Sequence, residues 1–247
     1  ETFVRRLCDG MGLPCVCKRI DLGAIRRERG GSLEEVGRDE RYRFLGKAAE
    51  ECGAVKIAVG HHRDDQAETV LLHLVRGCGT EGLRGILPVR EGRIIRPLLE
   101  VGRSDILAFL AAEGLSYMTD SSNADPLFLR NRIRNQLIPQ LAANGNPRLA
   151  EGLCQTARIV RREDDYLRRV AAEALRGLRT AEEDGEVAAL PLAEFGALHE
   201  AIRARIVKLL LDRVLPEGKG IGYRHIESVL ALARREDGRP GSLDLPY

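Results

Sequence analysis

The stretch that decides the fold joins a short apolar run, VKIAV at residues 55–59, to the polar sequence GHHRDDQAET at residues 60–69. The apolar run is typical of a buried strand. From Ala67 onward, apolar residues recur at helical spacing on one face. Ligands of open α/β sheets bind at the carboxyl ends of strands, so this strand-to-helix junction is the first candidate site.

The polar part of the junction contains two histidines, His61 and His62, and three acids, Asp64, Asp65 and Glu68. Carboxylates are good ligands for Mg²⁺, and an imidazole can transfer a proton or, when charged, pair with phosphate. Aspartate is also common at helix N-termini, where it caps free N–H groups. The residues alone therefore indicate either a cation or phosphate site or a structural cap. They do not separate a nucleotide-using enzyme from a metal hydrolase.

The first 77 residues alternate between helical and extended patterns. The pattern Ser32-x-x-Glu35 is a capping box, which marks the start of a helix. Before the junction we expect a helix at 3–11, a strand at 14–22, a charged loop at 24–31 and a helix at 32–52. This alternation predicts a parallel sheet with helices on its faces. Further along, a short strand is expected at 93–99, and helices at 104–113 and 126–137.

The composition limits the class of protein. The chain has 247 residues with 44% hydrophobic content, and its 39 Lys+Arg and 37 Asp+Glu give a net charge of +2. This charge does not by itself indicate a nucleic-acid partner. The six cysteines form no C-x-x-C pair, which fits free thiols and a cytoplasmic protein. No signal peptide and no apolar run of about 18 residues is present, so no membrane span is expected.

A glycine-rich segment follows the helix of the junction. It has four glycines between Gly77 and Gly85, and two arginines, Arg76 and Arg84. Such a segment either ends a helix with a series of turns or lets the backbone approach a ligand closely.

Two polar motifs come next. Asp120 and Asn123 form either an Asx-turn or a site for the ammonium group of a small substrate. Arg130, Arg132 and Arg134 lie in a helical pattern, as a solvated basic face or as a site for the phosphates of ATP or tRNA. Arg130 and Arg134 are four residues apart and share a face, whereas Arg132 points elsewhere.

The second half of the chain is expected to be mostly helical. A long helical pattern runs from Asn146 to about Arg179, and an acidic segment with few apolar residues follows at 180–189. Helices are then expected at 198–215 and 223–235. We expect three parts: a catalytic domain at 1–145, a linker helix at 146–180 and a small helical domain at 181–247.

Taken together, these motifs resemble the tRNA(Ile)-lysidine synthetase family, a bacterial branch of the PP-loop ATPases. The resemblance covers nearly the whole chain. It rests on HHxDDQAET at 61–69, LxRGxGxxGLxG at 74–85, RPLL at 96–99, DxSN at 120–123 and RNxIR at 130–134. Five motifs in the order and spacing of the family make a specific match.

The resemblance implies an α/β fold: a parallel-sheet PP-loop domain of the adenine nucleotide alpha hydrolase type, followed by a small helical substrate-specificity domain. It implies that ATP adenylates the C2 oxygen of the wobble cytidine in a tRNA(Ile) with a CAU anticodon. The ε-amine of L-lysine then displaces AMP and gives lysidine. ATP and Mg²⁺ are the implied cofactors, and the base must leave its stack to react. The oligomeric state is left open, with a homodimer among the options.

The resemblance also assigns roles by position. The expected catalytic residues are His61, His62, Asp64, Asp65 and Glu68, with Asp64 and Asp65 as the expected Mg²⁺ ligands. Asp120 and Asn123 are the expected lysine contacts. Phosphate or tRNA contacts are expected from Arg76, Arg84, Arg130, Arg132 and Arg134.

One part of the family pattern is missing. The Ser-Gly-Gly-x-Asp-Ser loop, which holds the ATP pyrophosphate in this family, occurs nowhere in the 247 residues. In the family it precedes the matched region, and Glu1 stands inside a helical pattern. We therefore expect the chain to be N-terminally incomplete, to lack the loop and the first strands of the sheet, and to be inactive by itself.

Three alternatives stay open. The first is a tRNA 2-thiolation enzyme of the same superfamily, some members of which use a C-x-x-C pair that is absent here. The second is a two-metal phosphohydrolase, which needs further ligands, whereas the remaining histidines lie in helical patterns. The third is a non-catalytic tRNA-binding module, which would bind with steep salt dependence and consume no ATP.

Overall fold

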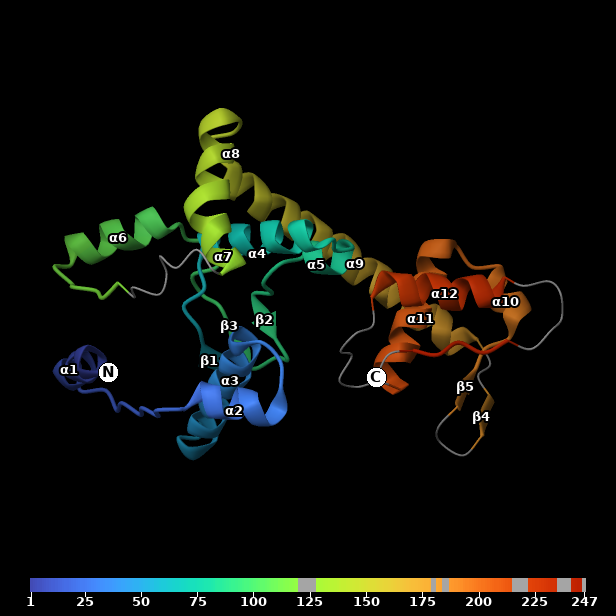
Figure 1. Cartoon of the computed structure of the whole chain (residues 1–247), viewed down its shortest axis with the longest axis horizontal. Helices are drawn as coiled ribbons and strands as arrows, with labels where there is room; N and C mark the ends of the chain where they lie inside the picture. Colours follow the sequence, from blue (N-terminus) through green and yellow to red (C-terminus); the bar gives the residue numbers. More distant parts are fainter. Residues whose placement is uncertain (120–127, 179–180, 184–186, 215–221, 235–240, 246–247) are drawn as a thin grey trace. The chain divides into compact units, whose positions relative to one another are not determined.

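The computed structural model describes residues 1–119, 128–178, 181–183, 187–214, 222–234 and 241–245 (Figure 1). The chain forms two compact units. Unit 1 comprises Glu1–Leu72 and Gly85–Cys154, and unit 2 comprises His73–Arg84 and Gln155–Tyr247. Two helices, α4 (Arg63–Arg76) and α9 (Leu149–Gly177), contribute residues to both units. The domain boundaries at 145 and 180 stay a prediction.

Unit 1 is an α/β unit. Its helices before α4 are α1 (Thr2–Gly10), α2 (Leu22–Arg29) and α3 (Leu33–Glu51). Its strands are β1 (Ile57–Ala58), β2 (Val89–Arg90) and β3 (Ile94–Ile95), and its later helices are α6 (Arg103–Ala112), α7 (Leu129–Arg132), η2 (Ile133–Leu137) and α8 (Ile138–Asn144). The α/β class expected from the sequence is thus confirmed.

The sheet of unit 1 is small and mixed, with the strand order β1-β3-β2. β1 runs parallel to β3 with Ile57 opposite Ile94, as expected for the strands at 55–59 and 93–99. The first of these strands is shorter than expected and not buried, since β1 covers only Ile57–Ala58 and Val55 is exposed. β2 is an antiparallel addition that the sequence did not suggest. It forms because Glu91 (φ 53°) and Gly92 (φ 62°) both take positive φ, which makes a tight hairpin between β2 and β3.

The prediction for residues 14–31 was wrong. Residues 14–21 form no strand in the structure, and α2 occupies most of the expected loop. The physical reason is a local cap: the Asp21 carboxylate accepts a hydrogen bond from the Ala24 N–H at 3.0 Å. Gly30, with φ 74°, ends the helix.

The predicted capping box of α3 is confirmed. Ser32 Oγ accepts from the Glu35 N–H at 3.2 Å, and the Glu35 carboxylate accepts from the Ser32 N–H at 2.9 Å. Helix α3 then runs to Glu51 and ends at Gly53, whose φ is 67°. The helix that follows β1 is also confirmed, as α4.

The arginine-bearing segment expected as one helix at 126–137 is described from Phe128 onward as α7, then the π-helical turn η2, then α8. Single π-turns often occur at functional sites. Ile133 begins η2 and is 1% exposed. It packs with Leu71 and Leu72 of α4, and further apolar residues surround this cluster. Apolar packing therefore holds the arginine-bearing segment against α4.

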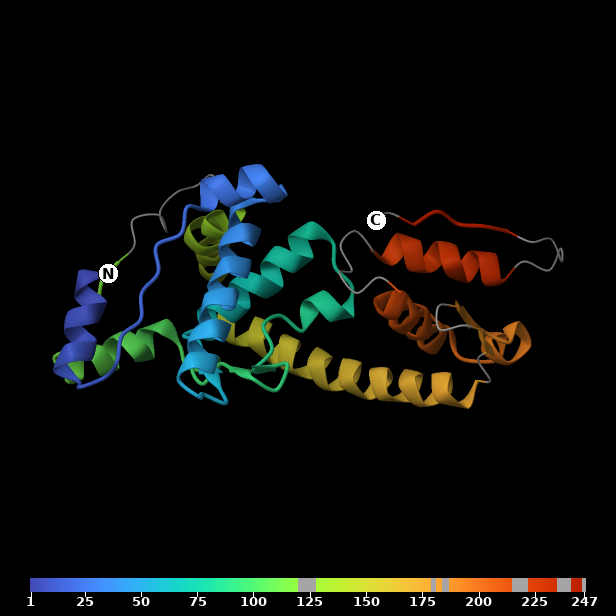
Figure 2. The same ribbon diagram turned by 90° about the horizontal axis from the view of Figure 1, so that it is seen from below.

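Unit 2 is mostly helical, as expected. Besides its part of α9 it contains the short helix α5 (Thr80–Leu83), the antiparallel pair β4 (Ala181–Glu183) and β5 (Val187–Ala189), and the helices α10 (Leu192–Gly196), α11 (Glu200–Val214) and α12 (Tyr223–Ala233). α11 and α12 lie side by side (Figure 2). The core of unit 2 is centred on Phe195, Ile206 and Leu230, with Ala171 and Leu175 from α9.

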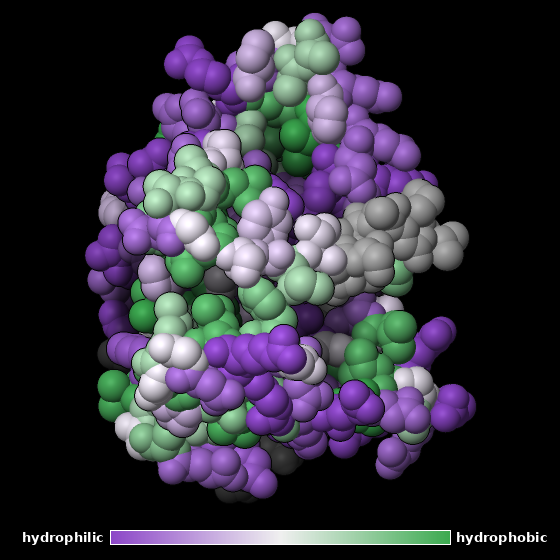
Figure 3. All heavy atoms as spheres, turned by 90° about the vertical axis from the view of Figure 1, so that its left-hand side faces the viewer, coloured by the Kyte–Doolittle hydropathy of each residue, from purple (hydrophilic) through white to green (hydrophobic). Residues whose placement is uncertain are grey.

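Several large apolar side chains of unit 1 are exposed, among them Val16, Val55 and Phe109. Figure 3 shows the side of the molecule that carries α1 and α6, where apolar residues are interspersed with hydrophilic ones. Scattered exposure of this kind is ordinary on protein surfaces. Among the described residues, no helix has both the length and the apolar composition needed to cross a bilayer.

Candidate functional site

The junction between β1 and α4 places the candidate residues at a helix N-terminus, where free backbone N–H groups gather. The Asp65 carboxylate accepts a hydrogen bond from the His62 N–H at 3.0 Å, so it caps α4. The Asp64 carboxylate accepts from the Arg103 N–H at 2.8 Å, at the start of α6. The prediction that an aspartate caps the helix of the junction is therefore confirmed for Asp65, whereas Asp64 accepts from the first residue of a different helix, α6.

Asp65 and Glu68 face two arginines of the segment that follows Phe128. Arg134 donates from Nε to Glu68 at 2.5 Å and from Nη2 to Asp65 at 3.2 Å. Arg130 donates from Nε to Glu68 at 3.0 Å and from Nη2 to Asp65 at 3.2 Å. Two carboxylates and two guanidinium groups thus form one network, here called the Arg–acid network.

The members of the Arg–acid network depend on one another because Glu68 is buried. Glu68 is 2% exposed, and the desolvation of a carboxylate at such a place must be offset by cations close by. The Glu68 carboxylate is also the main reason that the pKa of Arg134 is raised above its ordinary value. Glu68 therefore locks the two arginines in place. Because both guanidinium groups remain partly exposed, they can also contact an anion.

The two histidines have opposite electrostatic surroundings. Burial lowers the pKa of His61. The charges of Arg96, Arg130 and a further arginine lower it as well, whereas the charge of Asp65 acts in the opposite direction. The Asp64 carboxylate is the main cause that raises the pKa of His62, and Asp65 adds to it. The His62 ring bridges both acids, with Nδ1 3.6 Å from Asp64 and Nε2 3.4 Å from Asp65.

These surroundings separate the histidines chemically. His61 stays neutral near pH 7 and can accept a proton, whereas His62 carries a positive charge more readily. His61 Nδ1 is buried and has no hydrogen-bond partner among the described residues. The same holds for Nδ1 of His62, which lies 3.6 Å from Asp64 without a hydrogen bond.

The arginines expected to contact phosphate fall into different places. Arg130 and Arg134 join the network, and Arg132 is exposed, on another face of the helix. Arg76 and Arg84 belong to unit 2. Arg76 is exposed, whereas Arg84 pairs with Asp164 at 3.0 Å and with a neighbouring glutamate. The expected lysine contacts, Asp120 and Asn123, lie outside the described residues.

Gln66 is a residue that the sequence analysis did not single out. Its buried side-chain amide accepts a hydrogen bond from the Ile86 N–H at 2.6 Å and donates to the Ile86 carbonyl at 3.3 Å. Gly85 approaches this amide so closely that a Cβ there would lie 2.5 Å from Gln66 Oε1. The sequence holds one signal for this contact: the first motif contains a glutamine, Gln66, and the second motif ends with a glycine, Gly85.

The acids do not form a metal site in this arrangement. Asp65 already receives two guanidinium groups and the N–H of His62, and Asp64 receives the N–H of Arg103. Within the described part of the chain, no three His, Cys, Asp or Glu side chains are grouped to hold a cation. A Mg²⁺ ion needs several oxygen ligands with room for water. The expected Mg²⁺ role of Asp64 and Asp65 gains no support from this geometry.

Comparisons with known proteins agree with the fold. The chain is 39% identical over 254 residues to the tRNA(Ile)-lysidine synthase of Symbiobacterium thermophilum, covering 99% of this chain and 52% of the relative. It is 37% identical over 252 residues to that of Geobacillus kaustophilus, with 99% and 53% covered, and 33% identical over 230 residues to that of Clostridioides difficile, with 93% and 50% covered. The chain thus spans about half the length of these curated relatives.

A solved structure, the U34-tRNA thiolase NcsA from Methanococcus maripaludis with its [4Fe-4S] cluster, has a similar fold. The TM-score is 0.50 at 16% identity, and the match covers 64% of this chain and 56% of the thiolase. At this identity the likeness concerns the fold alone. Residues 1–141, which include the whole Arg–acid network, match the model of the PP-loop domain family. The chain therefore belongs to the PP-loop domain family.

Proposed function

We propose that this chain carries part of the site at which lysine is joined to C2 of the wobble cytidine of a tRNA(Ile) with a CAU anticodon. The observation that carries the proposal is the Arg–acid network, because it brings the HHxDDQAET and RNxIR motifs into one cluster. The names of the relatives agree with this substrate class.

The reaction has two bond exchanges. In the first, the C2 oxygen of cytidine attacks the α-phosphorus of ATP, and pyrophosphate leaves. In the second, the lysine ε-amine attacks C2, the C2–O bond breaks and AMP leaves with that oxygen. Adenylation is needed because an unmodified ring oxygen is a very poor leaving group. The ε-ammonium must lose a proton before its nitrogen can attack.

The network supplies charge to this sequence of steps. Arg130 and Arg134 are held by Glu68 on one side and remain partly exposed, so they are suited to the developing negative charge on phosphate. His61, neutral and with an orphaned ring nitrogen, is suited to accept the proton that the lysine ammonium releases. Asp120 and Asn123 stay the proposed lysine contacts.

Magnesium would offset the charge of the ATP phosphates. Because the described acids are engaged by arginines and backbone N–H groups, we assign none of them to the ion. The Ser-Gly-Gly-x-Asp-Ser loop that grips pyrophosphate in such enzymes is absent from the 247 residues. The chain by itself is therefore expected to bind tRNA without releasing AMP.

The test compares the 247-residue chain with a fusion that carries a segment with a Ser-Gly-Gly-x-Asp-Ser loop ahead of Glu1. Each is incubated with unmodified CAU tRNA(Ile), ATP and labelled lysine. The proposal expects AMP release and lysine incorporation in equal amounts from the fusion, and neither from the chain. In the fusion, Glu68→Gln should lower both, whereas Glu113→Gln, a change at an exposed acid, should lower neither.

Other outcomes would point elsewhere. AMP release without lysine, with sulfur transferred to the tRNA when a sulfur donor is present, would favour a thiolation enzyme. Binding of the tRNA with steep salt dependence by both proteins, and AMP release by neither, would favour a non-catalytic module.

A further inference from the structure

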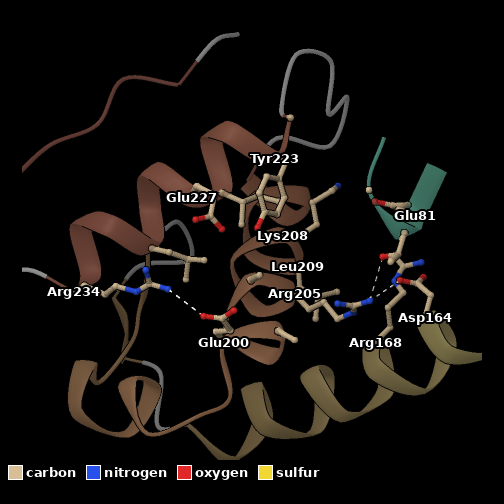
Figure 4. Close-up of a pocket in the computed structure, with 17 residues that line it drawn as sticks. Glu81, Asp164, Arg168, Glu200, Arg205, Lys208, Leu209, Tyr223, Glu227 and Arg234 are labelled. Atoms are coloured by element: carbon tan, nitrogen blue, oxygen red, sulfur yellow. Dashed lines mark hydrogen bonds and ion pairs between the residues drawn. The ribbon is translucent and has the colours of Figure 1, made fainter. Parts of the chain in front are cut away.

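Unit 2 contains a buried ionic triad that none of the motifs predicts. Asp164 of α9 is 4% exposed and stands between two arginines. Its Oδ2 lies 3.0 Å from Arg84 Nη1, and its Oδ1 lies 3.0 Å from Arg205 Nη2 of α11 (Figure 4). One carboxylate thus joins three segments that are far apart in the sequence.

The triad holds both ends of α5. At its C-terminal end, Arg84 also bonds to the side chain and the carbonyl of Glu81, at 2.9 and 3.2 Å. At its N-terminal end, Thr80 lies 3.5 Å from Arg205 Nη2. A third contact comes from His73, whose Nδ1 is 2.6 Å from the Gly82 carbonyl.

This helix depends on such contacts. It has four residues, none of them buried, and it lies in a segment with a glycine at 77, 79, 82 and 85. A short glycine-rich stretch loses much conformational freedom when it is ordered, and α5 has little apolar burial to offset that loss. Polar contacts must therefore hold α5 in place.

Asp164 is the key member because it neutralises both arginines. Removing this carboxylate takes the buried acid away from Arg205 and one of its two acidic partners away from Arg84, which costs more than losing the hydrogen bonds. The ordered α5 also forms a wall of a pocket of about 570 Å³ in unit 2. In Figure 4, Glu81 and Asp164 lie on one side of this pocket, while Tyr223 and Glu227 of α12 lie on another.

We infer that Asp164 is a positioning residue that holds the glycine-rich segment of unit 2 through Arg84 and Arg205. In this arrangement Arg84 is a structural partner of Asp164 before it is a phosphate ligand. Only the last step, that the ordered segment contributes to tRNA binding, rests on the proposed function.

The test uses Asp164→Asn in the 247-residue chain, with Asp165→Asn as the matched control. Asp165 is the next residue on α9, but its side chain is 66% exposed and pairs with a neighbouring surface arginine, Arg169, at 3.1 Å. Amide hydrogen exchange is followed for residues 73–84 and, as a reference, for α12. Trypsin cleavage after Arg84 is measured in parallel.

The inference expects exchange at 79–84 to rise about tenfold or more in Asp164→Asn, with α12 unchanged, because local opening exposes these amides. Cleavage after Arg84 should become faster as well. Asp164→Glu, which keeps the charge, should recover much of the protection, and Asp165→Asn should behave like the parent chain. Unchanged exchange at 79–84, or an equal rise throughout unit 2, would overturn the inference.

Arg84→Met keeps the test decisive if Asp164→Asn does not fold, because Asp164 then retains Arg205 as a partner. The same local rise in exchange is expected, and its absence would count against the inference.

A measurement of tRNA affinity distinguishes a failure of this inference from a failure of the proposed function. If the parent chain binds CAU tRNA(Ile), Asp164→Asn should weaken binding at least about fivefold, as expected when an ordered binding surface must first be formed, and Asp165→Asn should not. If the parent chain binds no tRNA, the proposed function fails, while the exchange data still decide the role of Asp164. Normal tRNA affinity of Asp164→Asn beside clear binding by the parent would refute the functional step.

Discussion

The side-chain amide of Gln66 hydrogen-bonds to both the N–H and the carbonyl of Ile86, as the backbone of a neighbouring strand would. It accepts from the Ile86 N–H at 2.6 Å and donates to the Ile86 carbonyl at 3.3 Å, so both backbone groups of Ile86 are satisfied by one buried amide. The segment just after the glycine-rich stretch is thereby tied to α4, one position after Asp65. This contact links the helix that carries the candidate acids to the chain that follows Gly85.

Gln66→Leu should destabilise unit 1 by roughly 1–3 kcal/mol, because the change takes the buried Gln66 amide away from the partly buried N–H and carbonyl of Ile86. Urea unfolding followed by circular dichroism measures the effect. Gln136→Leu, at an exposed glutamine of η2, is the control and should change the free energy of unfolding by less than about 0.5 kcal/mol. Equal stability of the two variants would argue against the role of Gln66.

Gly85→Ala tests the close approach on the other side of this contact. Gly85 has φ +59°, and a Cβ would lie 2.5 Å from Gln66 Oε1. Gly92→Ala is a matched control, since Gly92 has φ +62° but meets nothing within 4 Å. Both variants carry the backbone strain of roughly 1 kcal/mol, but only Gly85→Ala adds a steric clash.

Gly85→Ala should therefore be less stable than Gly92→Ala by at least about 1 kcal/mol in the same urea measurement, as expected for overpacking. In the background of Gln66→Ala the difference should shrink, since the clashing amide is gone. A difference that persists unchanged in that background would mean that Gln66 is not the neighbour that requires glycine at 85.

Glu68→Gln should cost about 3 kcal/mol, at the low end for breaking a buried ion pair, because Arg130 and Arg134 lose their shared carboxylate while both remain partly exposed. The comparison variant is Glu113→Gln, at an exposed acid at the end of α6, which should be close to neutral. Thermal unfolding at constant pH compares them. A loss below about 0.5 kcal/mol for Glu68→Gln would show that the network does not stabilise unit 1.

Local signals account for the parts of the structure that the sequence predicted. The capping box at Ser32 and Glu35 acts within one helical turn, and the change from the apolar run to the helical pattern at the junction is contained in about 20 residues. α2 was missed because the Asp21 cap stands inside a run that also suits a strand. β2 was missed because Glu91, not a glycine, takes one of the positive φ angles of its hairpin.

The site was only partly predictable for a different reason. His61, His62, Asp64, Asp65 and Glu68 are neighbours in the sequence, so a motif reveals them together. The pairing of Asp65 and Glu68 with Arg130 and Arg134 joins residues 62 to 69 positions apart. The packing of Ile133 against Leu71 and Leu72 of α4 helps to bring them together. The Asp164 triad is more remote still, since Arg84 and Arg205 have no shared motif. Charge pairs of this kind can be recognised only in the tertiary structure.

The last prediction concerns the pH response of the two histidines. The ordinary pKa of histidine is 6.5, and that of His61 is lowered by burial while that of His62 is raised by Asp64. The chemical shifts of the imidazole protons should therefore titrate below pH 6.5 for His61 and above it for His62. Single substitutions, His61→Gln and His62→Gln, assign the two signals. Titration of both on the same side of pH 6.5 would contradict the opposed surroundings.

The free energy of unfolding should depend on pH in the direction that these pKa shifts determine. The raised pKa of His62 means that its pairing stabilises the fold fully below pH 6.5 and that this contribution is lost as the pH rises through the folded-state value above 6.5. His62, followed by the backbone N–H of Arg103, lowers the pKa of Asp64 from 3.8 to about 2, so that the Asp64 contribution is present above pH 3.8 and is lost as the pH falls toward 2. Since Asp64 is well exposed, solvent screening limits its share to about 1 kcal/mol. Urea unfolding between pH 2 and 9 measures the free energy of unfolding as a function of pH. Asp64→Asn should reduce its fall at acidic pH, and His62→Gln should reduce its fall above pH 6.5. A variant whose pH dependence equals that of the parent chain would show that the substituted residue does not contribute in this way.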